Sequence, residues 1–125
     1  RGNRNLDIAL EVAIAPEGGE EKVVCRSNAK YLYWNMDQQL AHHTVNGCNI
    51  RAGDMMASGT ISGKDKSAYG SMLELTWRGA HPITLADGSE RKFIQDGDTV
   101  IMRGHAEKNG VRVGFGHVRT KVLKA

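Results

Sequence analysis

Two turn dipeptides near the end of the chain constrain its fold more than any other feature of the sequence. Asn109-Gly110 lies between the runs TVIMRGHAE and VRVGFGHV, and Asp87-Gly88 lies between PITL and ERKFI. These dipeptides are a strong hairpin signal, because their residues tolerate the positive φ that a two-residue turn requires. The last third of the chain is therefore predicted to form antiparallel hairpins.

Alternating or short apolar runs predict the remaining strands. Leu6 to Ile14 alternates with a period of two, which is typical of a strand with one buried face. The PEGGEE stretch makes a turn, and Lys22 to Cys25 is predicted to return from it. Met55 to Ser58 is a further short strand, and Ser71 to Arg78 alternates again, with Glu74 on its polar face.

One long helix is predicted, over residues of about 29–44. Its apolar positions fall four apart, at Leu32, Met36 and Leu40. This spacing makes the helix amphipathic. Ser27 or Asn28 is expected to cap its beginning, and Gly47 follows where a left-handed C-terminal cap is expected.

The predicted fold is mixed α+β and rich in strands. Fifteen glycines among 125 residues imply many turns. Gly104, Gly114 and Gly116 permit bends within the last two strands. We therefore expect a rolled or curved, mostly antiparallel sheet with one main helix at about 29–44, all within a single unit, 1–125.

Composition excludes several classes of function. The net charge of +3 is a mild excess spread along the chain, so no nucleic-acid partner is expected. No apolar run approaches the ~20 residues of a membrane span, so no membrane partner is expected. Cys25 and Cys48 are too few for a disulfide framework or a zinc site, and reduced thiols in a cytoplasmic protein are favoured.

Side-chain pattern alone assigns no chemistry. His42 and His43 are neighbours on the predicted helix and point about 100° apart, so they are not expected to hold one metal ion. No residue of the chain is assigned as a metal ligand. Glu74 on a strand is ordinarily solvated, and Thr60 between glycines is ordinarily a turn residue.

Three long strings carry a resemblance to a known family. They are QQLAHHTVNGCNIRAGDMMASGTISG, YGSMLELTWRG and RKFIQDGDTVIMRGHAEKNGVRVGFGHVRTKVL, and CRSNAKYLYWNMDQQL precedes them. In order and spacing they resemble the carboxy-terminal region of the fumarylacetoacetases, in the fumarylacetoacetate hydrolase family. The resemblance covers this whole chain but only the last third or so of the family's length.

This chain can be compared with the sequence pattern of the superfamily at two positions, Ile61 and Ala52. Shorter relatives typically read GTPSG, whereas Ile61 occupies the proline position here and KDKSAYGSMLEL follows. This is similar to fumarylacetoacetases proper. Ala52 departs from the proline that the family commonly has before Gly-Asp, which changes the rigidity of the turn.

The resemblance implies hydrolysis of a carbon–carbon bond in 4-fumarylacetoacetate, giving fumarate and acetoacetate, the last step of tyrosine degradation. Glu74 matches a family glutamate that works with a histidine to activate water, and Thr60 matches a threonine that contacts the substrate. The resemblance also implies a divalent metal, Ca²⁺ and/or Mg²⁺, a homodimer, a small diketo acid as substrate, and a cytoplasmic location.

The resemblance further implies that part of the site lies before Arg1. The family's catalytic histidine, metal-binding carboxylates and oxyanion-stabilising group come earlier in its sequences, and no histidine of this chain matches the catalytic one. We therefore interpret 1–125 as the carboxy-terminal part of a catalytic domain, and expect it to be inactive alone.

Two alternatives stay open at this point. One is a related acylpyruvate hydrolase, decarboxylase or isomerase of the same superfamily. The other is a non-catalytic fragment that only pairs with a partner chain. Assays of fumarylacetoacetate beside acylpyruvates distinguish the first alternative from a fumarylacetoacetase. The presence or absence of an upstream segment distinguishes the second alternative from an enzyme.

Overall fold

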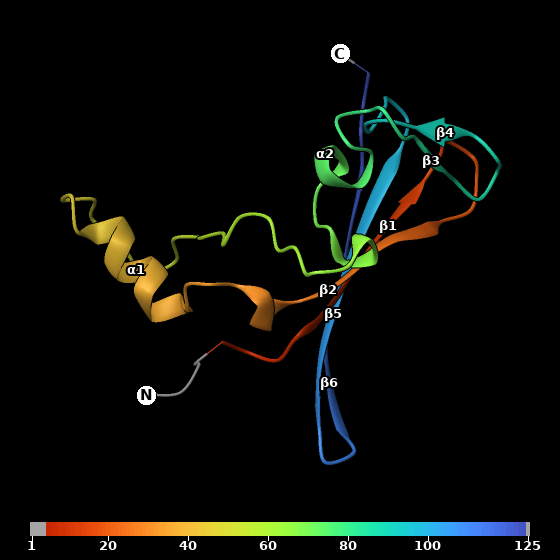
Figure 1. Ribbon diagram of the computed structural model, residues 1–125. Coiled ribbons are helices and arrows are strands. Elements are labelled where there is room, and N and C mark those ends of the chain that lie inside the picture. The colour runs from red at the N-terminus through yellow and green to blue at the C-terminus, as the bar shows by residue number, and fades with distance from the viewer. Residues whose placement is uncertain (1–4, 125) are drawn as a thin grey trace.

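Four long strands form one antiparallel sheet in the computed structural model, which describes residues 5–124 (Figure 1). They are β1 (Ala9–Ala15), β2 (Lys22–Asn28), β5 (Thr99–Lys108) and β6 (Val111–Lys121). Their order is β2-β1-β5-β6, so β2 and β6 are the two edges of an open sheet. A second, two-stranded sheet pairs β3 (Ile83–Thr84) with β4 (Glu90–Arg91). The expected β-rich α+β class is confirmed.

Both predicted hairpins are present. Asn109 and Gly110 have φ of 53° and 77°, which is the two-residue turn that joins β5 to β6. Asp87 and Gly88 lie in the turn between β3 and β4, where the Asp87 carboxylate accepts a hydrogen bond from the Ser89 amide at 2.9 Å. The side chain thereby replaces a backbone acceptor in the turn.

The β1–β2 hairpin is also present, with different bounds from those predicted. β1 begins at Ala9 rather than Leu6, and β2 continues to Asn28 rather than ending at Cys25. The expectation of one buried face is wrong for the end of β1. Three consecutive residues, Ala13 to Ala15, are buried there, because Ala13 and Ala15 pack with Ile101 on one face while Ile14 is covered on the other.

The predicted helix of about 29–44 is shorter than expected. A 3₁₀ turn occupies Ala29–Tyr31, and α1 covers only Met36–Thr44. The beginning of α1 is fixed by a capping box, in which Asn35 accepts from the Gln38 amide at 2.9 Å and Gln38 accepts from the Asn35 amide at 3.0 Å. Asn28 instead caps the 3₁₀ turn, through the Lys30 amide.

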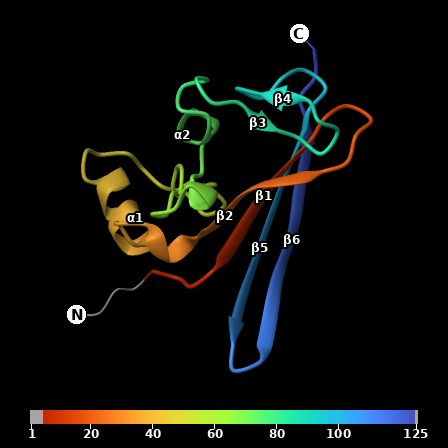
Figure 2. The same ribbon diagram turned by 45° about the vertical axis from the view of Figure 1, so that its right-hand side comes forward.

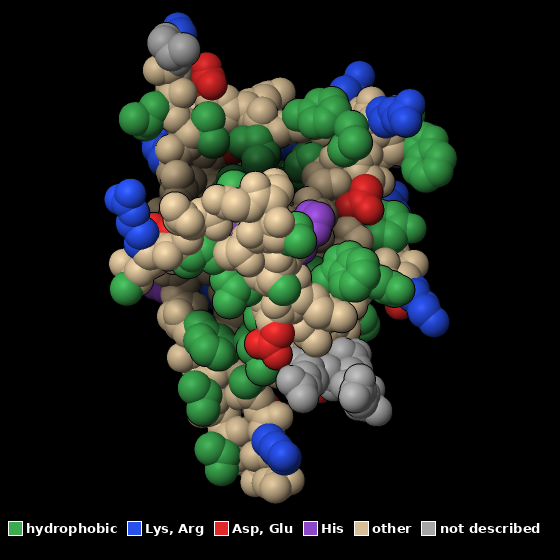
Figure 3. All heavy atoms as spheres, turned by 90° about the vertical axis from the view of Figure 1, so that its left-hand side faces the viewer, with side chains coloured by type: hydrophobic (Ala, Val, Ile, Leu, Met, Phe, Trp, Pro, Cys, Tyr) green, Lys and Arg blue, Asp and Glu red, His purple; other side chains and the backbone are tan. Residues whose placement is uncertain are grey.

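The helix α1 lies away from the sheet at the end of an extended segment (Figures 1 and 2). None of its residues is buried. The rings of Tyr33 and Trp34, just before it, meet edge to face at 4.7 Å and are both exposed. Figure 3 shows hydrophobic side chains spread across this face of the molecule, with Lys and Arg side chains mostly at its rim.

Two predicted strands are wrong. Residues 55–58 form no strand, and the segment predicted as a strand from Ser71 to Arg78 instead begins with α2 (Met72–Leu75). The Ser71 side chain accepts a hydrogen bond from the Glu74 amide at 3.3 Å, which starts a helical turn. Leu75 is buried, whereas Leu73 and Trp77 are exposed, so the alternating apolar residues of this segment do not form one buried face.

Within residues 5–124, the helices are too short and too polar for any of them to cross a lipid bilayer.

Candidate active site around Glu74

The carboxylate of Glu74 is held by two serine hydroxyls. Its Oε2 accepts hydrogen bonds from Ser62 Oγ at 2.7 Å and from Ser71 Oγ at 2.9 Å. Ser71 is the N-cap residue of α2, three residues before Glu74, whereas Ser62 lies in the loop that precedes the second 3₁₀ turn, Lys66–Ala68. Glu74 is half-buried. Glu74 was predicted on the polar face of a strand, but it lies on a short helix with its carboxylate fixed by hydrogen bonds.

Hydrogen bonds hold the Ser62 loop against the segment before α2. The Gly70 amide donates to Ser62 Oγ at 3.0 Å, and the Gly63 amide donates to the Ala68 carbonyl at 2.9 Å. Ser27 Oγ, at the end of β2, donates to the Ile61 carbonyl at 3.0 Å. The loop is therefore attached to both the sheet and the start of α2.

Gly70 allows the two segments to approach closely. A Cβ at Gly70 would lie 2.5 Å from the Ile61 carbonyl oxygen and 3.0 Å from Thr60 Cγ2. These separations are shorter than a van der Waals contact, so any larger residue would push the segments apart. Thr60 is exposed and lies beside Gly70. Residues 60–62 cross residues 70–74 at this point, and the same crossing carries the contacts of Glu74.

The chain leaves α2 through a strained turn. Trp77 and Arg78 have φ of 50° and 57°, in the left-handed region that non-glycine residues rarely adopt. Together with Leu73 and Glu74 they line a cavity of about 460 Å³. Backbone strain of this kind is frequent at functional sites. Glu74 therefore borders a surface hollow as well as the serine hydroxyls.

A second cavity, of about 470 Å³, separates the segment around Ser71 from the sheet. Cys25, 4% exposed, lines it together with Val12 and Ile14 of β1. Burial raises the pKa of the Cys25 thiol, and the nearby negative charge of Glu74 raises it further. Both cysteines are free thiols, and Cys48 is exposed.

The protein family described as "Fumarylacetoacetate (FAA) hydrolase C-terminal" matches this chain over residues 2–123. The chain belongs to this family. It is 61% identical to the fumarylacetoacetase of Caenorhabditis elegans over 122 residues, which are 96% of this chain and 29% of that protein. It is 53% identical to the fumarylacetoacetase of Homo sapiens over 121 residues, again 96% of this chain and 29% of that protein.

The fumarylacetoacetase of Dictyostelium discoideum is 50% identical over 128 residues, which cover 100% of this chain and 30% of that protein. The chain therefore spans less than a third of the length of these relatives. The resemblance to the fumarylacetoacetate hydrolase family that the three sequence strings indicated is confirmed.

The described part of this family member does not by itself form a metal centre. Among residues 5–124, no three His, Cys, Asp or Glu side chains lie close enough to hold one ion. His42 and His43 are exposed in the last turn of α1. The donors of these residues therefore do not fit a divalent cation, and no chemical step is assigned to a metal within them.

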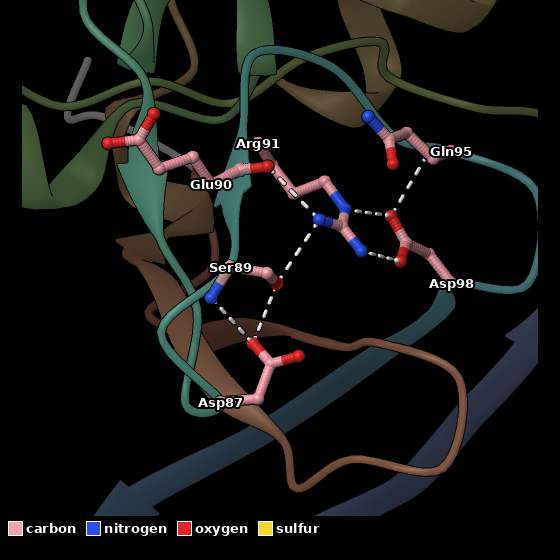
Figure 4. Close-up of polar contacts among 6 residues, drawn as sticks. All are labelled: Asp87, Ser89, Glu90, Arg91, Gln95 and Asp98. Carbon is pink, nitrogen blue, oxygen red and sulfur yellow. Dashed lines mark hydrogen bonds and ion pairs between the residues drawn. The ribbon is translucent and has the colours of Figure 1, made fainter.

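A second held carboxylate, Asp98, lies at the start of β5 (Figure 4). Its Oδ2 accepts from Arg91 Nε at 2.9 Å and from the Gln95 amide at 2.9 Å, and its Oδ1 accepts from the second guanidinium nitrogen, NH2, at 3.0 Å. Arg91 also donates to Ser89 Oγ, 3.2 Å away. Asp98 is 1% exposed, so it belongs to the interior rather than to a surface site.

The sequence contained a signal for part of the Glu74 site that the alternating pattern obscured. Ser71 and Glu74 have the Ser-x-x-Glu spacing of a capping box, which predicts a helix beginning after Ser71. Ser62 carries no comparable signal. Its contact with Glu74 joins residues 12 positions apart, and it exists because the Ser62 loop packs against α2.

Proposed function

We propose that the intact protein hydrolyses 4-fumarylacetoacetate to fumarate and acetoacetate. The observation that carries this proposal is the carboxylate of Glu74, fixed at one oxygen by Ser62 and Ser71 in a chain with fumarylacetoacetase relatives 50–61% identical to it. A fixed carboxylate is the group that orients a histidine base in hydrolases.

In the proposed reaction, Glu74 accepts a hydrogen bond from a histidine contributed by chain outside residues 5–124. The other nitrogen of that imidazole takes a proton from water as the water oxygen attacks the ketone carbon of the substrate. The carbon–carbon bond then breaks, its electron pair leaves on the acetoacetate fragment as an enolate, and a proton returns to that carbon. The negative charge of Glu74 stabilises the imidazolium formed between these steps.

Thr60 is proposed to contact the substrate. It is exposed beside Gly70, and none of residues 5–124 forms a hydrogen bond with its hydroxyl. A hydroxyl in this position has both its proton and its lone pairs available for a substrate oxygen. Thr60→Val is expected mainly to raise KM, because it removes a hydrogen bond and keeps the size of the side chain.

The proposal includes a divalent metal, Ca²⁺ and/or Mg²⁺, bound by carboxylates outside residues 5–124. It also includes a homodimer, a cytoplasmic location, and the interpretation of 1–125 as the carboxy-terminal part of a catalytic domain. The family membership of the chain supports these points.

The test is steady-state kinetics of the intact protein with Glu74→Gln. Loss of a positioned acid–base partner is expected to lower kcat by about 10²- to 10⁴-fold. Glu107→Gln is the matched control, because Glu107 is an exposed glutamate at the end of β5. Full turnover by Glu74→Gln would contradict the assigned role. Acylpyruvates assayed beside fumarylacetoacetate separate this reaction from the related hydrolases.

A further inference from the structure

We infer that Ser62 and Ser71 are positioning residues, which fix Glu74 through Oε2 and leave Oε1 available to a reaction partner. This inference rests on the proposed role of Glu74. Both hydroxyls donate to the same oxygen, at 2.7 Å and 2.9 Å. These separations lie within the usual range for O–H···O hydrogen bonds.

Backbone amides set the direction in which each hydroxyl donates. Ser62 Oγ accepts from the Gly70 amide at 3.0 Å, and Ser71 Oγ accepts from the Glu74 amide at 3.3 Å. A serine hydroxyl has one proton and two lone pairs. Since an amide occupies a lone pair of each oxygen, the single proton of each hydroxyl is directed to the carboxylate. The two donors are therefore oriented before any ligand binds.

The second carboxylate oxygen, Oε1, is left open. None of residues 5–124 donates a hydrogen bond to it, and no side-chain oxygen or nitrogen in that range is both fully buried and unpaired. Oε1 is therefore accessible to solvent. The residue Glu74 also lines the cavity shared with Leu73, Trp77 and Arg78. One oxygen is bonded internally and the other is presented outward.

The donors are also neutral. Hydroxyl groups restrict the rotamer of a carboxylate without cancelling its negative charge, whereas a guanidinium would neutralise it. A glutamate that is already ordered loses less side-chain entropy when it binds a partner. Small displacements of a group in an active site lower turnover strongly, so both hydroxyls are expected to contribute to kcat.

The experiment uses Ser62→Ala and Ser71→Gly in the intact protein. Each is expected to lower kcat by about 10- to 100-fold with little change in KM, because each removes one hydrogen bond to a charged group. Glycine is chosen at position 71 because it is well tolerated as an N-cap, so α2 keeps its start. Ser62→Thr keeps the hydroxyl and is expected to restore most of the turnover.

Ser58→Ala is the matched control, because among residues 5–124 the Ser58 hydroxyl donates only to the carbonyl of Gly59, at 3.2 Å. It is expected to leave kcat unchanged. Thermal unfolding of each variant separates an effect on folding from an effect on the site. A loss of kcat in Ser58→Ala equal to that in Ser62→Ala would overturn the inference.

A double-mutant cycle tests whether the serines act through Glu74. In the Glu74→Gln background, Ser62→Ala and Ser71→Gly are expected to change kcat less than about twofold, since residues that act as a unit are not additive. Full, additive losses in that background would overturn the inference. If Glu74→Gln loses turnover while both serine variants keep it, the inference fails and the proposed function stands. If Glu74→Gln itself keeps full turnover, the proposed function fails.

Discussion

The protein holds two carboxylates by different means, and the difference separates a structural group from the group that we propose to be catalytic. Asp98 is 1% exposed, and both of its oxygens accept from the guanidinium of Arg91. Glu74 is half-buried and, within residues 5–124, bonds neutral hydroxyls through one oxygen only. A buried charge that is paired within the protein has a structural role, whereas a charge that is fixed but not neutralised is available for chemistry.

The surroundings of the two groups follow the same division. The Asp98 backbone accepts from the Val122 amide at 2.8 Å, so this carboxylate lies where the chain enters β5 and leaves β6. Glu74 instead borders a cavity and a turn with two positive φ values. The region of Asp98 is buried and hydrogen-bonded, whereas the region of Glu74 contains backbone strain and a surface cavity.

The largest expected effect comes from breaking the Asp98 pair. Asp98→Ala leaves the Arg91 guanidinium, largely buried, without its counter-charge. Removal of one partner from a buried pair is expected to destabilise the protein by about 3–5 kcal/mol. Denaturant-induced unfolding of the intact protein measures this. Glu74→Gln should change the free energy of unfolding by less than about 1 kcal/mol, and an equal loss in both variants would contradict the comparison.

A smaller effect is expected at the crossing that carries Glu74. Gly70→Ala places a Cβ 2.5 Å from the Ile61 carbonyl oxygen, which forces the two segments apart. Overpacking of this kind destabilises by about 1–3 kcal/mol, and turnover should fall because Ser62 moves relative to Glu74. Gly114→Ala, which meets no atom within 4 Å, is the control for unfolding and kcat. Wild-type kcat in Gly70→Ala would show that the crossing does not position the site.

A pH dependence distinguishes the paired carboxylate. Burial acts to raise the pKa of Asp98, but hydrogen bonds from Arg91 and the Gln95 amide, with the charge of Arg91, outweigh it and hold the pKa below its ordinary value of 3.8. A group with a lowered pKa stabilises the folded state above its unfolded pKa, and this contribution is lost as the pH falls through the folded pKa. The loss therefore occurs below about pH 4.

Unfolding of the wild type and of Asp98→Asn between pH 2 and pH 7 checks this sign. Other carboxylates titrate in the same range, so the difference between the two proteins is the informative quantity. The difference in stability should be largest near neutral pH and should shrink towards pH 2. A difference that is constant with pH would contradict the assignment to Asp98.

The smallest effect concerns the thiol beside Glu74. Cys48 is exposed, whereas Cys25 is buried and has a raised pKa, so an alkylating reagent at pH 8 should modify Cys48 much faster. Peptide mapping identifies the modified residue. Glu74→Gln removes one of the two causes of the raised pKa and should speed the modification of Cys25 slightly. Equal rates at the two thiols in the wild type would show that Cys25 is not protected.

Local pattern predicted the elements whose geometry is decided within a few residues. The turn at Asn109-Gly110 was predicted correctly because two consecutive positive φ values restrict the residue types that fit. The pattern failed for Ser71 to Arg78, where alternation suggested a strand but the Ser71 side chain starts a helix. It also overextended the helix to 29–44, because four-residue spacing continued across the capping box at Asn35.

The sequence by itself determined the hairpins, the β-rich class, and the resemblance that selected Glu74 and Thr60. Only the tertiary structure decided how Glu74 is held. The Ser62 hydroxyl contacts Glu74, and the Ile61 carbonyl accepts a hydrogen bond from Ser27 at the end of β2. Such contacts depend on packing between segments that are distant in the chain. A periodic pattern reports which face of an element is apolar. It contains no information about which loop crosses which, and that crossing gives the carboxylate one bonded and one open oxygen.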